Sequence, residues 1–106
     1  MQNIMSSKEK VYSKKQERLA RYSKALGHPA RVFILDFIAS TKTMSCYSGE
    51  LADNLTIARS TLSQHLTELK SAGLIVGEAD PPFIRYCIDR ESWDEARKMF
   101  KTFFAR

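Results

Sequence analysis

Two short helices joined by a turn are predicted between Ser48 and Gly73, and this stretch constrains the fold more than any other. The first helix should run from Gly49 to about Asn54, with Ser48 placed to cap it by accepting a backbone N–H. The second should run from Arg59 to Ala72, because three leucines recur at spacings that place them on one side of a helix: Leu62, Leu66 and Leu69. Gly73 follows at a position that tolerates the left-handed backbone which ends many helices. The pattern predicts a helix-turn-helix.

The side of the second helix opposite the leucines carries small hydroxyl and amide side chains: Ser60, Gln64, Thr67 and Ser71, flanked by Thr61 and Ser63. A helix face that is only solvated more often carries Lys and Glu. Ser, Thr and Gln can donate and accept hydrogen bonds at base edges and phosphates. The composition of this face favours a DNA recognition helix, and an ordinary amphipathic helix is the alternative.

Charge is distributed unevenly along the chain. The formal net charge is +5, which is typical of a protein with a polyanionic partner such as nucleic acid or an anionic membrane surface. Residues 1–31 carry eight Lys or Arg against two Glu, whereas residues 32–80 carry three against six acidic residues. If DNA is bound, we therefore expect the first helix and the C-terminal part to supply most of the electrostatic attraction, and the recognition helix to supply neutral hydrogen bonds.

Length and composition point to one domain in the cytoplasm. The 106 residues fit one domain, which we expect to span residues 8–106 after a flexible tail at residues 1–7. The sequence has no apolar run long enough to span a membrane and no hydrophobic signal core at its N-terminus, so no membrane association is expected. Two cysteines do not make a disulfide framework, and reduced thiols are expected.

The remaining elements are predicted to surround the helix-turn-helix. A basic amphipathic helix should cover Lys8 to Leu26, a nearly all-apolar central helix Pro29 to Ser40, and a short extended piece Met44 to Tyr47. Two strands, Leu74–Val76 and Phe83–Ile88, should flank a turn-prone interval from Gly77 to Pro82, in which two successive prolines exclude the tight two-residue Asn-Gly kind of hairpin. A hairpin directly after a recognition helix is the wing of a winged helix. The expected fold class is therefore mainly α with a small β-hairpin (α+β), in the order helix, helix, short strand, helix, helix, hairpin, helix.

The last helix, from Glu91 to about Phe104 with Asp89 as its cap, is rich in aromatic residues. A tryptophan and three phenylalanines on one terminal helix exceed what so small a chain readily buries. We therefore predict a homodimer formed by the first and last helices, with two recognition helices about 34 Å apart. Burial in the protomer's own core is the alternative. The predicted interface residues are Tyr12, Leu19, Tyr22, Trp93, Phe100, Phe103 and Phe104.

The runs ALGHPARVFIL and GELADNLTIARSTLSQHLTELKSAGLI resemble the ArsR/SmtB family of bacterial winged-helix repressors, over roughly Leu19 to Phe100. The combination of L-x-H-P-x-R, G-E-L-A, S-T-L-S-Q-H-L and L-K-x-A-G-L-I is far more diagnostic than a general helix-turn-helix pattern. The resemblance implies a homodimer that binds a palindromic operator in double-stranded DNA, represses its own or a neighbouring operon, and is released by a small inducer, often a thiophilic metal or metalloid ion.

The resemblance also implies DNA contacts from the recognition helix, at Arg59, Ser60, Thr61, Ser63, Gln64 and His65. His65 lies near the apolar stripe, so a structural hydrogen bond is an equal alternative for it. Relatives often carry Arg or Lys at the tip of the wing, but here the tip is Glu78-Ala79-Asp80-Pro81-Pro82. Because acidic groups beside phosphates are unfavourable, we expect the wing to contribute little, or to touch DNA only through Arg85.

The metal sites of relatives are incomplete in this sequence. Metal-sensing relatives carry a C-x-C motif at the start of the helix-turn-helix, whereas here Cys46 is followed at that spacing by Ser48, whose hydroxyl is a poor ligand for soft ions. The last helix has no histidine, and Asp94 and Glu95 alone make no site. One hypothesis remains. If the strand of Cys46 pairs with the outer wing strand of Cys87, the two thiols could share a metalloid ion or oxidise together; two unrelated half-buried cysteines are the alternative.

Functions of other classes have less support. Ser63 and His65 face different directions on their helix, and the sequence has no nucleophile elbow and no glycine-rich phosphate loop, so an enzyme is not expected. A winged-helix module for protein interaction or non-specific nucleic-acid binding is the alternative to a repressor, with Phe103 and Phe104 as its adhesive surface.

Overall fold

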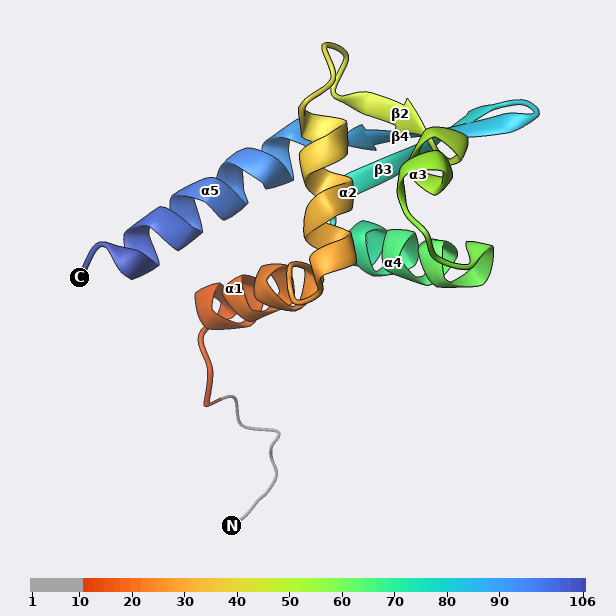
Figure 1. Ribbon diagram of the computed structural model, residues 1–106. Coiled ribbons are helices and arrows are strands. Elements are labelled where there is room, and N and C mark those ends of the chain that lie inside the picture. Colours follow the sequence, from red (N-terminus) through yellow and green to blue (C-terminus); the bar gives the residue numbers. More distant parts are fainter. Residues whose placement is uncertain (1–10) are drawn as a thin grey trace.

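The computed structural model, which describes residues 11–106, has five helices and a small three-stranded antiparallel sheet at one edge of the molecule (Figure 1). Along the chain the elements are α1 (Lys14–Ala25), α2 (Pro29–Ala39), β2 (Ser45–Tyr47), α3 (Ser48–Asn54), α4 (Arg59–Ser71), β3 (Ile75–Asp80), β4 (Phe83–Ile88) and α5 (Arg90–Phe104). The predicted fold class and element order are confirmed. The predicted tail at residues 1–7 and the first three residues of the predicted first helix lie outside the described residues.

The first helix begins at Lys14, later than predicted. Ser13 precedes it, and its hydroxyl accepts from the Gln16 N–H at 3.1 Å while the Gln16 side chain accepts from the Ser13 N–H at 2.9 Å. This reciprocal pair is a capping box, which satisfies two backbone donors at the helix start. Tyr12, which the prediction placed within this helix, therefore lies before it, and Tyr12 is 66% exposed.

The helix-turn-helix lies where the leucine pattern placed it. On α4, Leu62, Leu66 and Leu69 are buried, and Gly73 follows the helix with a positive φ of 82°. The prediction that Ser48 caps α3 was wrong, because Ser48 is the first residue of the helix and Tyr47 occupies the cap position. The Glu50 carboxylate accepts from the Tyr47 N–H at 3.0 Å, so an acidic side chain in the first turn satisfies this helix start.

The sheet has the order β2-β4-β3, so the last wing strand is its centre. β3 pairs with β4 as far as Asp80, which lies opposite Phe83, and only Pro81 and Pro82 connect the strands. The predicted longer turn from Gly77 was therefore wrong. The two prolines form a two-residue connection with a cis peptide bond between them, a geometry in which the second proline takes the third position of the turn.

The core lies where α2, α3, α4 and the sheet meet. The largest fully buried side chains are Ile34, Ile38, Leu51, Leu69 and Ile75. The nearly all-apolar composition of α2 suggested a buried helix, but only part of its surface is buried, because Val32 and Phe33 are 48% and 37% exposed on its outer side. None of the described helices is long and apolar enough to cross a membrane.

Candidate nucleic-acid interface

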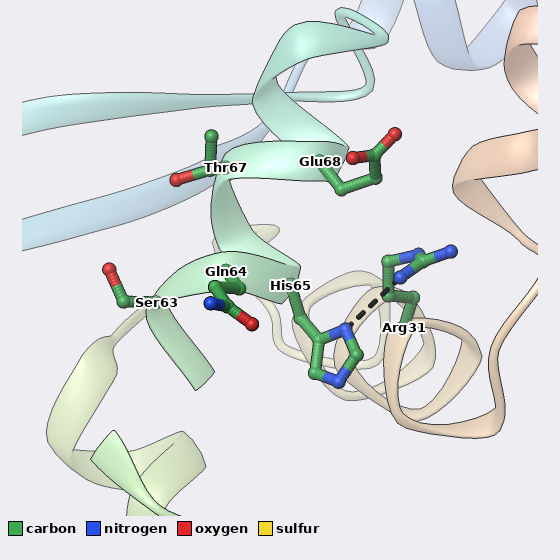
Figure 2. Close-up of a pocket in the computed structure, with 6 residues that line it drawn as sticks. All are labelled: Arg31, Ser63, Gln64, His65, Thr67 and Glu68. Atoms are coloured by element: carbon green, nitrogen blue, oxygen red, sulfur yellow. Dashed lines mark hydrogen bonds between the residues drawn. The ribbon is translucent and has the colours of Figure 1, made fainter. Parts of the chain in front are cut away.

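Uncharged polar side chains cover the outer side of α4. Because the leucines on the inner side are buried, the opposite side faces solvent: Ser60, Ser63, Gln64, Thr67 and Ser71 are exposed, and Thr61 is half-buried. We call these six residues the polar face of α4. Figure 2 shows Ser63, Gln64 and Thr67 projecting from the helix. Arg59, at the start of α4, is exposed beside them.

Two hollows in the surface flank the polar face. One, of about 460 Å³, is lined by Arg31, Ser63, Gln64, His65, Thr67 and Glu68 (Figure 2). The other, of about 370 Å³, lies between α3, α4 and β4 and includes Ser48, Ser60 and Tyr86. The polar face therefore lies between two concave surfaces, a shape that fits contact with another macromolecule.

His65 is not part of the exposed face. Its side chain is buried, and its Nδ1 lies 3.1 Å from Nη1 of Arg31 on α2. Since a guanidinium only donates, Nδ1 accepts, and the proton of the neutral ring is on Nε2. Burial first, and then the charges of His28 and Arg31, lower the pKa of His65. Of the two roles that the sequence left open for His65, the structure favours the structural hydrogen bond.

The basic residue of the wing is already paired. Arg85 Nη2 donates to Glu78 Oε1 at 2.8 Å, and Arg85 Nη1 donates to the Ser45 hydroxyl at 3.3 Å. The Glu78 hydrogen bond is the first cause that raises the pKa of Arg85. The second acidic group, Asp80, accepts from the Tyr47 hydroxyl at 2.5 Å. Beyond these pairs the tip exposes Phe83 and Ile84, so it offers little free positive charge to phosphates.

The two cysteines extend from opposite faces of the sheet. The predicted pairing of their strands is present, but in its register Cys46 lies opposite Tyr86, and Cys87 lies opposite Ser45. Residues directly opposite share a face, and successive residues alternate faces. Cys46 is buried in the core, whereas Cys87 is half-buried on the outer face. This arrangement does not support the shared thiol site, and it favours two unrelated cysteines.

We expect the two thiols to react independently, with Cys87 labelled first. Burial is the main cause that raises the pKa of the Cys46 thiol to about 11, so only about one molecule in a thousand carries its thiolate at pH 8. Mass spectrometry of the chain during iodoacetamide treatment measures the order of labelling, and Cys46→Ala and Cys87→Ala assign the sites. A mild thiol oxidant should leave no disulfide within the chain. Loss of both free thiols from a monomeric product would contradict the opposite-face arrangement.

The two acidic side chains of the last helix that the sequence analysis considered as metal ligands, Asp94 and Glu95, are engaged in ion pairs. Asp94 is 2.6 Å from Arg97 Nη2 and 3.8 Å from Arg90 Nε. Glu95 lies 2.8 Å from Arg18 Nε. Within residues 11–106 no group of three or more His, Cys, Asp and Glu side chains is arranged to hold a metal ion.

The first and last helices are joined inside one protomer. Glu95 Oε1 on α5 accepts from Arg18 Nε at 2.8 Å and from the Tyr22 hydroxyl at 2.5 Å, and these two bonds lower the pKa of Glu95. Tyr22 is 3% exposed and packs in the protomer's own core, so the structure favours for it the alternative of burial within the protomer. Leu19, Trp93 and Phe100 are half-buried, whereas Phe103 and Phe104 are 43% and 74% exposed at the end of α5.

The contact of Arg31 with His65 was not predicted from the sequence. Arg31 belongs to the L-x-H-P-x-R motif, but the motif alone does not show that its guanidinium reaches α4. Nothing in the local pattern of α2 indicates a partner 34 residues further along the chain.

The fold and the polar face of α4 together define the class of domain to which the chain belongs. A short helix, a second helix with an exposed polar face, and a β-hairpin directly after it make up a winged helix-turn-helix domain.

Comparison with known proteins places the domain in a family. Residues 28–76 match the family described as bacterial regulatory protein, arsR family. The chain is 34% identical over 76 residues to the HTH-type transcriptional regulator YgaV of Escherichia coli strain K12, covering 72% of this chain and 75% of YgaV. It is 35% identical over 74 residues to the HTH-type transcriptional regulator CmtR of Mycobacterium bovis, covering 70% of this chain and 60% of CmtR. The chain belongs to the ArsR family.

A solved structure agrees on the fold. An ArsR-like transcriptional regulator from Rhodococcus sp. RHA1 superposes with a TM-score of 0.73 at 22% identity, covering 88% of this chain and 85% of that one. The chain spans about 60% of the length of the CmtR relatives that it matches. Members of the ArsR family are helix-turn-helix regulators and not enzymes, which agrees with the expectation from the sequence.

Proposed function

We propose that the chain is a sequence-specific DNA-binding transcriptional regulator, and that it acts as a homodimeric repressor of its own or a neighbouring operon. The polar face of α4 carries this proposal, because six uncharged hydrogen-bonding side chains stand on a helix that buried leucines hold in place. Amide and hydroxyl groups at the centre of such a face can pair with base edges in the major groove. Such a regulator works in the cytoplasm, where bacterial DNA lies.

The shape of the protomer supports the homodimer. Its radius of gyration is 16.4 Å, against about 13 Å for a compact domain of 100 residues. The chain is extended because α5 projects on one side of the molecule and the wing on the other (Figure 1), and the end of α5 exposes Phe103 and Phe104. Packing of α1 and α5 against a second copy would bury those rings, and a two-fold axis would present two α4 helices to a palindromic operator.

Release by a small inducer completes the proposal. Because the two thiols extend from opposite faces and Asp94 and Glu95 are paired with arginines, we assign no metal or metalloid ion to these residues.

Exposed Phe103 and Phe104 also suit the second candidate function, a module for protein interaction or non-specific nucleic-acid binding.

Selection of duplexes from a random pool with the full chain tests the proposal. Affinities for the selected and a scrambled duplex are then compared at several salt concentrations. A repressor should prefer its selected site by about a thousandfold or more at physiological salt. Equal affinities with a steep salt dependence would instead favour the non-specific module.

A further inference from the structure

One arginine joins three helices beside the polar face. Arg31 is in the first turn of α2, and its Nε and Nη2 donate to the carbonyls of Ala25 at 2.8 Å and Lys24 at 2.9 Å, at the end of α1. These carbonyls belong to the last turn of a helix, where cations are favourable. The third contact is with Nδ1 of His65 on α4, shown as a dashed line in Figure 2. Arg31 thereby fixes α4 relative to α1 and α2.

The contact depends on the protonation state of His65. Arg31 has only donors, so Nδ1 of His65 must accept and cannot carry a proton. The second imidazole, His28, is 4.5 Å away between ring centroids, and its Nδ1 accepts from the Ala30 N–H at 3.0 Å. Glu68 of α4 lines the same hollow as His65, and its carboxylate pairs with Lys24 of α1 at 3.4 Å. A proton on Nδ1 would place a donor against Arg31 and a second cation beside it.

The contact lies directly behind the residues that the proposed function assigns to DNA. Gln64 precedes His65 in α4, and both line the same hollow with Arg31. We propose that Arg31 and His65 are positioning residues that hold α4 in its DNA-binding orientation, and that protonation of His65 releases α4 and weakens operator binding in mild acid. This inference rests on the proposed DNA-binding function.

The direction of the effect separates this role from simple electrostatics. Burial lowers the pKa of His65 in the folded protein below its ordinary value of 6.5. The neutral imidazole therefore contributes its full stabilisation above pH 6.5, and this stabilisation is lost as the pH falls through the lowered pKa of the folded state. Positioning by His65 therefore predicts weaker specific binding in mild acid. A histidine that only added positive charge near phosphates would instead tighten binding as it became protonated.

Specific binding by the full chain should be measured at fixed salt from about pH 7.5 to about pH 5, for the wild type and His65→Asn. The Asn side-chain oxygen stands near the place of Nδ1 and can accept from Arg31, but it does not titrate. We expect the wild type to lose about tenfold in affinity, within the limit of tenfold per pH unit for one proton. His65→Asn should bind like the wild type at high pH and give a flat profile.

Two further variants complete the set. Arg31→Lys keeps the charge but cannot reach three acceptors, so we expect it to bind about tenfold more weakly at every pH. His28→Asn keeps an acceptor for the Ala30 N–H and removes the only other histidine of the chain, so the acid loss should persist in it. Thermal unfolding of each variant without DNA, at each pH, shows that the protein remains folded.

The outcomes are distinct. Wild-type binding that stays constant or tightens in acid, or an equal acid loss in His65→Asn, would overturn the inference. A chain that prefers no duplex even at high pH would remove the proposed function itself, whereas specific binding without the acid loss removes only the role of Arg31 and His65.

Discussion

Replacing Gln64 with alanine is expected to weaken binding to the operator by roughly tenfold to a hundredfold, the range for loss of one bidentate base contact. Gln64 is at the centre of the exposed polar face, where its amide can both donate to and accept from one adenine edge. Fluorescence anisotropy with operator and scrambled duplexes measures the change. Because the lost group is neutral, affinity for the scrambled duplex and the salt dependence should stay near the wild-type values.

Arg85→Ala is the matched control for that variant. It removes a cation, but Arg85 is already paired with Glu78, so we expect operator affinity within about threefold of the wild type. A loss for Arg85→Ala as large as for Gln64→Ala would show that the wing contributes as much as α4. A loss for Gln64→Ala that is equal on both duplexes would show that Gln64 makes no sequence-specific contact.

The polar face could be predicted because it depends on local periodicity alone. The spacing of Leu62, Leu66 and Leu69 fixes which side of α4 is buried, and the opposite side follows from the geometry of a helix. The end of α4 could also be predicted from the local sequence, since Gly73 follows it with a left-handed backbone. The start of α1 was also marked locally, by Ser13 and Gln16 at capping-box spacing.

Features that depend on tertiary contacts could not be predicted from the sequence. β3 continues through Gly77 and Ala79, which have low strand propensity, because pairing with β4 determines its length. The pairing of β2 with β4 was predicted, but the relation of Cys46 to Cys87 depends on register, and a shift of one residue reverses the face of every side chain. The Arg31–His65 contact joins two helices through side chains whose partners no periodicity reveals.

Replacing both Phe103 and Phe104 with glutamate is expected to convert the protein to a monomer at micromolar concentration and to weaken operator binding by a hundredfold or more, an order-of-magnitude estimate. The centroids of the two rings lie 5.1 Å apart, edge to face, at the exposed end of α5. A glutamate charge buried there between two copies would be strongly unfavourable. Sedimentation equilibrium measures the oligomeric state. The large loss in DNA affinity follows because a dimer binds its second half-site at high effective concentration, whereas a monomer does not.

Phe83→Glu is the matched control, since Phe83 is 62% exposed at the wing tip and undergoes the same chemical change away from α5. It should remain a dimer. A duplex that contains one half-site separates assembly from folding: the double variant should bind it as the wild-type protomer does, because α4 is unchanged and surface substitutions alter stability little. If the double variant stayed dimeric and bound the full operator normally, the second copy would have to pack elsewhere, and the exposed Val32 and Phe33 of α2 would then be the next surface to substitute.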